Sequence, residues 1–366
     1  MRSIFFFLIL GCTLGIHVYV TSSLLKFLPP CVPARIFLIV LAVTVLLFPF
    51  AHHFFGEHLP NWLDRTLYNI SFSWITLIPY FLIAFFLLDV SRWFRLFPVE
   101  KLYANWISVA VIAGVALVIL LLGHRQYVHK VRVPLDIACP KISGEPLVIV
   151  GMSDLHLGAG IGRAELETWI ERIHAEEPDI VLLAGDIIDG DCRALLRDGI
   201  AEALAGIHAR YGVYAVPGNH EYYVGMEEAE AFLRGAGITL LRDEAALVDN
   251  RLCIVGRDDR SNPKRKPLAE LIAPYSGKLP IIVLDHQPFD LGSVEENGID
   301  FQFSGHTHGG QIWPINHITD ILFECAHGYI RKGDSHIYVS SGIGIWGGKY
   351  RIASQSEYLV LRLSGG

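Results

Sequence analysis

Three stretches of this chain share one pattern, an apolar run that ends in polar residues. They read PLVIVGMSDLHLG at 146–158, IVLLAGDIID at 180–189 and YGVYAVPGNHE at 211–221. Apolar runs of this length predict buried strands, and a segment with helical spacing follows each of them. These helices are predicted at 164–176, 193–208 and 226–235. Alternation of strand and helix predicts an α/β fold, in which polar residues at the carboxyl ends of the strands gather at one site.

The second half of the same domain is rich in strands. They are predicted at 246–256, 280–285, 299–304, 336–341 and 356–363. Strands that follow a strand–helix half predict two packed mixed β-sheets flanked by helices. We therefore place a soluble domain at 146–366, preceded by a polar, Pro-containing linker at 124–145. The basic stretch RDDRSNPKRKP at 257–267 is predicted to be a solvated surface loop.

The first third of the chain is overwhelmingly apolar. Residues 1–123 hold seven Lys/Arg and four Asp/Glu, which leaves 23 Lys/Arg and 33 Asp/Glu for the remainder, a net charge of −10. Apolar segments long enough to cross about 30 Å of hydrocarbon predict a bundle of four transmembrane helices. They lie at about 4–22, 34–55, 67–90 and 104–123. Three spans are the main alternative, and a secretory signal peptide is the alternative for the first segment.

Four spans would place both termini on one side of the membrane. Five Lys/Arg fall on either side, so the overall charge balance does not decide the orientation. Arg125, Lys130 and Arg132 follow the last span directly and favour an internal C-terminal domain. The cysteines of that domain lack disulfide-module spacing, which agrees with a reducing compartment. We expect a multi-pass protein of the inner or plasma membrane whose soluble domain faces the cytoplasm.

Five short segments place Asp, His and Asn side chains at predicted strand ends. They are Asp154-Leu155-His156, Gly185-Asp186-Ile187-Ile188-Asp189, Gly218-Asn219-His220-Glu221, His286 and Gly305-His306-Thr307-His308. Carboxylates can bridge two cations, neutral imidazole binds Mn, Fe, Zn or Co, and Asn adds a neutral oxygen ligand. Gly185 and Gly218 are predicted to allow tight turns before Asp186 and Asn219. Each segment alone is weak evidence, but the ordered set predicts a centre for two divalent metal ions.

The ordered set resembles the signature of the calcineurin-like metallophosphoesterase superfamily, D-x-H, G-D-x-x-[DE], G-N-H-[DE], a single His and G-H-x-H. The resemblance covers about residues 146–362. It implies a calcineurin-like catalytic domain at 146–366 that uses two divalent metal ions, such as Mn, Fe or Zn. It also implies hydrolysis of a phosphoester by in-line attack of a metal-bridging hydroxide.

The resemblance also assigns roles to single residues. The implied ligands of one metal are Asp154, His156 and His308, those of the other are Asn219, His286 and His306, and the implied bridge is Asp186. His220 resembles the histidine that stabilises or protonates the leaving oxygen, and Glu221 is expected to orient or polarise that ring. Asp189 is expected to support the ligands without binding metal.

Further sequence segments resemble the membrane-associated branch of this superfamily. They comprise Asp-Leu-His-Leu-Gly, Gly-Asn-His-Glu and Gly-His-Thr-His-Gly-Gly-Gln-Ile, beside the apolar N-terminal third. Some members act on lipid-linked phosphoesters, including UDP-2,3-diacylglucosamine. The soluble pyrophosphohydrolases for that substrate carry Arg where His220 stands, so this chain departs from them. We expect a lipid-linked or membrane-proximal phosphoester as the substrate, and no protein partner.

The charge of the soluble domain bears on its partners. Nucleic acid is bound by basic surfaces, so the net charge of −10 over residues 124–366 argues against it. Two other functions remain open. One is hydrolysis of a soluble nucleotide or small phosphoester, with the helices acting only as an anchor. The other is a catalytically silent membrane sensor, which missing ligands would signal, whereas here every ligand is present.

Several residues outside the ligand set have two interpretations. Trp313 and Trp346 either form a hydrophobic wall for an acyl chain or pack ordinarily. Lys349 and Arg351 either meet a substrate phosphate or are surface charge. Asp285 either accepts a hydrogen bond that supports the neighbouring ligand or simply ends a strand.

Overall fold

The computed structural model describes residues 2–55, 58–190 and 192–365 of the chain. By their internal packing these residues form two compact units. The first comprises Met1–Arg125 with Gly347–Tyr350, and the second comprises Gln126–Trp346 with Arg351–Gly366. We call them the helical unit and the catalytic unit.

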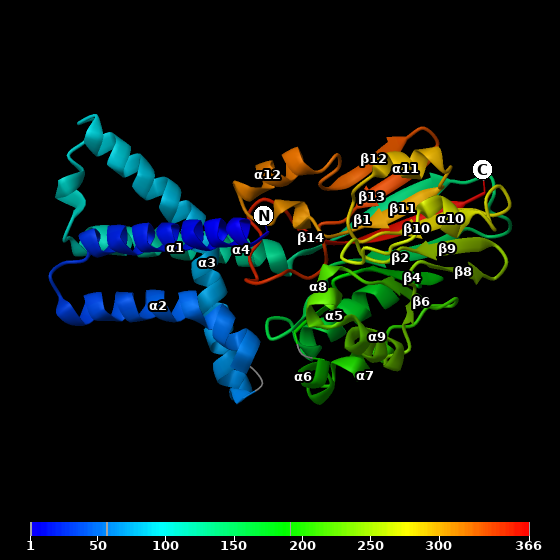
Figure 1. Ribbon diagram of the computed structural model, residues 1–366, viewed down its shortest axis with the longest axis horizontal. Helices are drawn as coiled ribbons and strands as arrows, with labels where there is room; N and C mark the ends of the chain where they lie inside the picture. The colour runs from blue at the N-terminus through cyan, green and yellow to red at the C-terminus, as the bar shows by residue number, and fades with distance from the viewer. Residues whose placement is uncertain (1, 56–57, 191, 366) are drawn as a thin grey trace. The chain divides into compact units, whose positions relative to one another are not determined.

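Long helices make up the helical unit (Figure 1). They are α1 (Arg2–Phe27), α2 (Val32–Phe55), α3 (Asn61–Trp93) and α4 (Trp106–Val128), with a short 3-10 turn at Val99–Leu102. Among the described residues, three stretches are long and apolar enough to cross a membrane, and they lie in α2, α3 and α4. Helix α1 contains the first predicted span, but it is not one of these three. The prediction of four transmembrane helices is therefore not confirmed.

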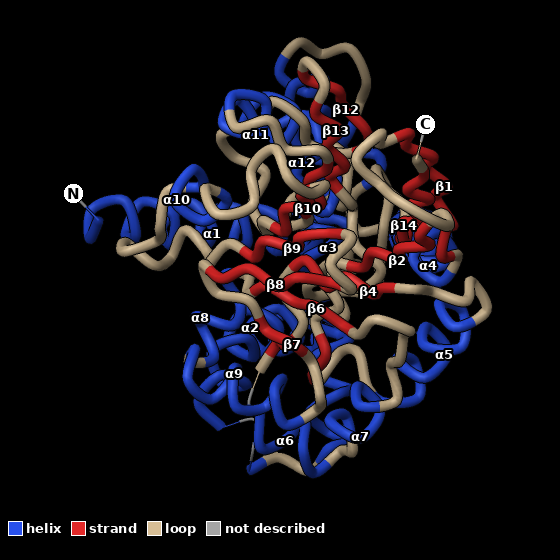
Figure 2. Tube along the Cα trace, turned by 90° about the vertical axis from the view of Figure 1, so that its right-hand side faces the viewer, coloured by secondary structure: helices blue, strands red, loops and turns tan. Residues whose placement is uncertain are grey.

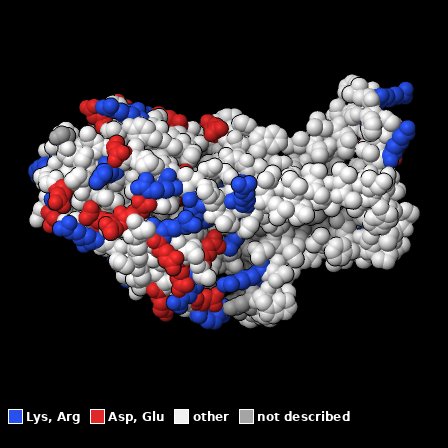
Figure 3. Space-filling view, turned by 180° about the vertical axis from the view of Figure 1, so that it is seen from behind, with Lys and Arg blue, Asp and Glu red and all other residues white. Residues whose placement is uncertain are grey.

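The surface of the helical unit differs in composition from that of the catalytic unit. Figure 3 shows acidic and basic side chains intermixed over the visible face of the catalytic unit, whereas most of the visible face of the helices is uncharged. Two polar groups among the helices pair with other helices: His17 Nε2 lies 2.9 Å from the carbonyl oxygen of Ala42, and the Tyr19 hydroxyl donates to Asp89 at 2.8 Å.

The catalytic unit is built on two six-stranded sheets. The first runs in the order β1 (Lys130–Ala138), β14 (Ser356–Ser364), β2 (Leu147–Met152), β4 (Ile180–Ala184), β6 (Val213–Val216) and β7 (Thr239–Leu240). The second runs β12 (Gly328–Lys332), β13 (Ser335–Val339), β11 (Phe301–Ser304), β10 (Ile281–Leu284), β9 (Leu252–Gly256) and β8 (Glu244–Val248). The inner strands of both are mainly parallel, and β14 pairs with β2 antiparallel.

The sheets pack face to face, with helices on their outer faces (Figure 2). Ile149 and Leu182 of the first sheet share a buried cluster with Ile254 and Phe303 of the second. A Cβ at Gly151 would lie 2.8 Å from the Phe303 ring, so this position admits only glycine without a shift. The outer face of the first sheet is covered by α5 (Arg163–His174), α7 (Ile200–Ala205) and α9 (Met226–Gly235). Helices α10 (Leu268–Ile272) and α11 (Leu291–Glu296) cover the second. The predicted α/β architecture of mixed sheets is confirmed.

Three details differ from the sequence prediction. Residues assigned to the linker form β1, which pairs in parallel with β14 along its whole length, a long-range contact without a local signal. The helix expected at 193–208 is divided into α6 (Cys192–Arg197) and α7 because Gly199 has a left-handed φ of 70°. The strand expected at 246–256 is the hairpin β8–β9, which turns through Asp249 and Asn250, both with positive φ. Asp and Asn tolerate that backbone region better than other residues.

Candidate metal centre

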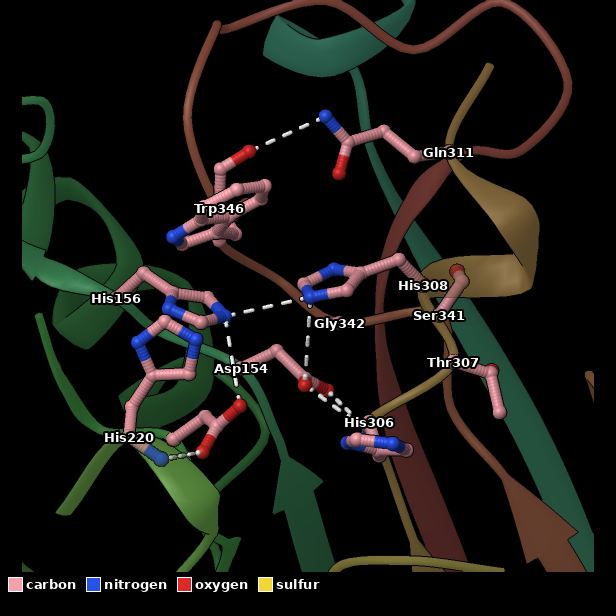
Figure 4. Close-up of polar contacts among 12 residues, drawn as sticks. Asp154, His156, His220, His306, Thr307, His308, Gln311, Ser341, Gly342 and Trp346 are labelled. Atoms are coloured by element: carbon pink, nitrogen blue, oxygen red, sulfur yellow. Dashed lines mark hydrogen bonds and ion pairs between the residues drawn. The ribbon is translucent and has the colours of Figure 1, made fainter. Parts of the chain in front are cut away.

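The predicted ligands follow strands of both sheets. Asp154 and His156 follow β2, Asp186 follows β4, Asn219 begins helix α8 (Asn219–Val224) after β6, His286 follows β10, and His306 and His308 follow β11. Since the carboxyl ends of these strands meet at one edge of the two-sheet core, side chains 152 positions apart in sequence come into contact. Figure 4 shows Asp154, His156, His220, His306 and His308 converging on one region.

A first group of donor atoms consists of Asp154, His156 and His308, all within 4.8 Å of one another. The two Nε2 atoms are 3.3 Å apart, and His308 Nε2 lies 3.7 Å from Asp154 Oδ1. Ligand atoms about 2.0–2.2 Å from one cation lie about 3–3.5 Å apart, so these spacings suit a shared metal. Burial lowers the pKa of His156 to about 4 and that of His308 well below its ordinary value, which leaves both rings neutral, as metal ligands must be.

A second group consists of Asp186, His286 and His306. The His286 Nδ1 lies 2.7 Å from the carbonyl oxygen of Ala184, and donation there leaves the Nε2 lone pair for a ligand. This Nε2 is 3.1 Å from Asp186 Oδ2, yet it makes no hydrogen bond to any described residue. Burial lowers the pKa of His286, but the interactions with Asp186 and Asp154 outweigh burial and raise it to about 10, so a cation would have to displace a proton from Nε2. The same negative field attracts metal cations.

Two further observations bear on the second group. The Asn219 Oδ1 atom is buried and has no hydrogen-bond partner within the described part of the chain. An unsatisfied buried acceptor costs about 1–3 kcal/mol, so its presence points to a missing electropositive partner. Asp186 Oδ2 also lies 3.8 Å from His156 Nε2, so one carboxylate reaches both groups, as the predicted bridge requires. The residues therefore fit a pair of cations in donor type and spacing.

The backbone at this site is strained. Five of the seven predicted ligands have positive φ values between 46° and 74°: Asp154, His156, Asp186, His306 and His308. A residue with a Cβ loses roughly 1–2 kcal/mol in that region. Strain of this kind persists where surrounding structure enforces it, commonly at functional sites. Sequence alone did not indicate it.

Glycine is required at positions 185 and 218 for different reasons. Gly185 has φ 79°, and a Cβ there would lie 2.6 Å from His286 Nδ1. The predicted tight turn is therefore present. Gly218 has an ordinary extended φ of −105°, so the predicted turn requirement is wrong at this position. A Cβ at Gly218 would lie 2.2 Å from Asp186 Oδ1, which makes close approach to that carboxylate the reason for glycine.

The charge of Glu221 contributes to the raised pKa of His220, but its carboxylate hydrogen-bonds to backbone groups and does not orient the His220 ring. The fully buried Glu221 carboxylate accepts four backbone N–H bonds, from Asp186, Ile187, Ile188 and Gly218, at 2.7–3.0 Å. Four N–H donors occupy the acceptor capacity of a carboxylate. Glu221 therefore fixes the Asp186 loop against the start of α8.

Asp189 is the carboxylate that contacts His220. Its Oδ1 lies 3.1 Å from His220 Nδ1. Burial lowers the pKa of His220, but the hydrogen bond that its Nδ1–H donates to Asp189 and the charge of Asp186 outweigh burial and raise the pKa to about 8. A ring that is protonated at neutral pH, with Nδ1 held by Asp189, presents Nε2–H as a proton donor. The signal for this role was the position of Asp189 inside the Gly-Asp motif.

Arg351 is neither surface charge nor a phosphate ligand. It is fully buried and donates to the carbonyl oxygens of His308, Ser341, Gly342 and Gly344. Burial lowers its pKa to about 10, so it stays charged at neutral pH. The loop that it holds packs against the centre, because a Cβ at Gly342 would lie 2.8 Å from the Cβ of Asp154. Arg351 therefore supports a metal ligand through the backbone.

We expect Arg351→Lys to lower the free energy of unfolding by about 3 kcal/mol, because an ammonium group cannot reproduce the buried guanidinium fork. Thermal unfolding of the purified protein measures this effect. A raised KM with unchanged thermal stability would instead indicate a phosphate contact.

The remaining predictions have mixed outcomes. Asp285 forms ion pairs with Arg257, at 3.2 Å, and with Arg265. It therefore anchors the basic loop at 257–267 and does not support a ligand side chain. The loop at 257–267 is therefore only partly solvated, because these two arginines are largely buried.

Trp313 and Trp346 are 44% and 48% exposed, so neither packs in a core. Figure 4 shows Trp346 beside His156 and His220, and its ring lies 6.2 Å from that of His220.

Comparison with known proteins agrees with the site. The model of the calcineurin-like phosphoesterase family matches residues 147–310. Among curated proteins, an uncharacterized metallophosphoesterase of Aquifex aeolicus is 34% identical over 61% of this chain and 87% of its own length. An uncharacterized metallophosphoesterase of Helicobacter pylori is 33% identical over 62% of this chain, which spans 65% of that relative. A Danio rerio protein described as a transmembrane protein with metallophosphoesterase domain is 30% identical over 63% of this chain and 55% of its own length.

Proposed function

This chain belongs to the calcineurin-like metallophosphoesterase family, and on that premise we propose that it is a membrane-anchored phosphoesterase for a lipid-linked or membrane-proximal substrate. The observation that carries the proposal is the convergence of two donor groups joined by the Asp186 carboxylate. The proposed ligands of two divalent cations are Asp154, His156 and His308, then Asn219, His286 and His306, with Asp186 between them. Such cations would lower the pKa of a water molecule and neutralise phosphate oxygens.

The protein residues have definable tasks in this reaction. Asp186 and the histidines would hold the two cations, which when bound would orient the phosphoester through its oxygens. We assign His220 as the general acid, whose Nε2 donates a proton to the leaving oxygen, since its raised pKa of about 8 keeps it protonated at neutral pH. Asp189 holds that ring in position through Nδ1. The Trp346 ring lies 6.2 Å from the His220 ring.

The membrane part of the proposal is supported by the apolar helices and by the transmembrane relative. A soluble enzyme would not need helices that match the thickness of a bilayer. Anchoring concentrates the site near substrates that are themselves in the membrane. Arg125, Lys130 and Arg132 favour a cytoplasmic position for the catalytic unit.

Hydrolysis by the purified full-length protein in detergent with Mn²⁺ tests this function. The panel would contain bis-p-nitrophenyl phosphate, p-nitrophenyl phosphate, UDP-2,3-diacylglucosamine and common phospholipids. Preferred turnover of a lipid substrate is the expected result. Turnover of soluble phosphoesters alone would reduce the helices to an anchor, and absence of any metal-dependent turnover would favour a silent sensor.

Asp189→Asn is expected to move the alkaline limb of the pH–kcat profile toward acid by about one unit. A general acid works while protonated, so activity falls as pH rises through its pKa. Loss of the Asp189 charge lowers that pKa, and activity is then lost at lower pH. Rate measurements between pH 5 and about 10 would check the shift. An unchanged alkaline limb would exclude the assigned role of His220 and Asp189.

A further inference from the structure

Helix α12 (Ile315–Leu322) exposes its apolar side chains. Ile318, Ile321 and Leu322 are 52%, 83% and 63% exposed, and no residue of the helix is buried. Asn316 instead faces the protein, since its Oδ1 is buried and its Cα lies against Gly310. The helix is thus amphipathic with its apolar side outward, the reverse of a helix that covers a soluble core.

The exposed apolar side chains of α12 and of the residues before it form one surface. We call it the α12 face, and it consists of Trp313, Ile315, Ile318, Ile321 and Leu322, all at least 39% exposed. A contiguous exposed apolar surface of this kind marks an interaction site. Tryptophan at its start suits a membrane interface, where the ring is partly apolar and its N–H remains hydrated.

The α12 face borders the candidate metal centre. The helix follows the 3-10 turn η3 (His308–Gly310), which contains one proposed ligand. At its other end the Phe323 ring lies 6.0 Å from the ring of His306 and 4.7 Å from that of Phe289. One end of α12 therefore follows the turn that contains His308, and the residue after its other end lies beside His306. A partner that binds the α12 face lies close to these two proposed metal ligands.

We propose that the α12 face docks onto the surface of a lipid bilayer, with its isoleucines at the boundary between headgroups and acyl chains. This inference rests on the proposed membrane attachment. Helix α4, which is apolar enough to cross a membrane, ends at Val128, and β1 begins at Lys130. Because one residue separates them, the catalytic unit stays within reach of any bilayer that α4 crosses. An apolar helix of this type binds about 5–10 Å into the interface.

Docking of the α12 face has a consequence for the substrate. The metal ligands His306 and His308 flank this helix, so insertion brings the centre to the depth of lipid headgroups. A phosphoester in the headgroup region would then reach the metals while its acyl chains remain in the membrane. The docked helix thereby favours a membrane lipid over a soluble phosphoester of the same chemistry.

Depth-dependent quenching in proteoliposomes tests the proposal. In full-length protein with Cys12→Ser and Cys31→Ser, the remaining cysteines are buried, so an added cysteine takes the fluorescent label NBD selectively. Ile321→Cys probes the α12 face. Leu247→Cys in β8 is the matched control, with 49% exposure, and Val115→Cys in α4 reports on the membrane span. Vesicles contain phosphatidylcholine with or without bromine on the acyl chains.

Labels at positions 321 and 115 are expected to lose roughly half of their emission in brominated vesicles, while the label at 247 keeps its emission. Quenching at 115 without quenching at 321 would overturn docking and leave membrane attachment intact. No quenching at 115 would overturn both proposals. If emission at 321 changes with the number of protein molecules per vesicle and not with bromination, the α12 face contacts a second copy of the protein. That result would overturn bilayer docking.

Discussion

Asp186→Asn is expected to reduce kcat/KM for bis-p-nitrophenyl phosphate by at least about a thousandfold, which corresponds to about 4 kcal/mol of transition-state stabilisation. Asp186 Oδ2 lies 3.1 Å from His286 Nε2 and 3.8 Å from His156 Nε2, so its charge serves both donor groups. An amide of the same shape removes that charge. The remaining Oδ1 still accepts the backbone N–H of His220, so the fold is expected to persist.

Rates with added Mn²⁺ and bound metal per protein together check this prediction. Loss of activity should accompany loss of metal, while thermal unfolding stays near that of the unaltered protein. Asp334→Asn is the matched control because the Asp334 side chain is fully exposed, and it should change neither quantity. Full activity of Asp186→Asn would overturn the proposed centre.

Glu221→Ala is expected to destabilise the catalytic unit by about 4 kcal/mol, because four buried N–H groups lose their acceptor. For a unit of this size the Tm should fall by roughly 10 °C. These N–H groups include Asp186 and Gly218, so metal affinity should fall together with stability. Thermal unfolding in detergent, with and without Mn²⁺, measures both effects.

Glu227→Ala is the control for the loss of a glutamate, since Glu227 is exposed in the first turn of α9. It should leave the Tm unchanged. Glu221→Gln keeps the volume but turns an amide toward two N–H donors, and an intermediate loss is expected. A Tm of Glu221→Ala equal to that of the control would show that water replaces the carboxylate and would remove its structural role.

The sequence by itself determined the order of strands and helices and the residues that end them. Apolar runs, glycines and helix spacing act between near neighbours, so the ends of β2, β4 and β6 could be predicted from local pattern. The same local pattern brought Asp154, Asp186 and Asn219 to one predicted edge. Confirmed features are the α/β architecture and the family, because both depend on these local signals.

Only the tertiary structure decided which side chains contact one another. It paired His220 with Asp189 instead of Glu221, buried Arg351 under the ligand loop, and turned the apolar side of α12 outward. It also joined β1 to β14, more than two hundred residues away along the chain. Such contacts depend on register and packing between distant segments, and neighbouring residues in sequence carry no information about them.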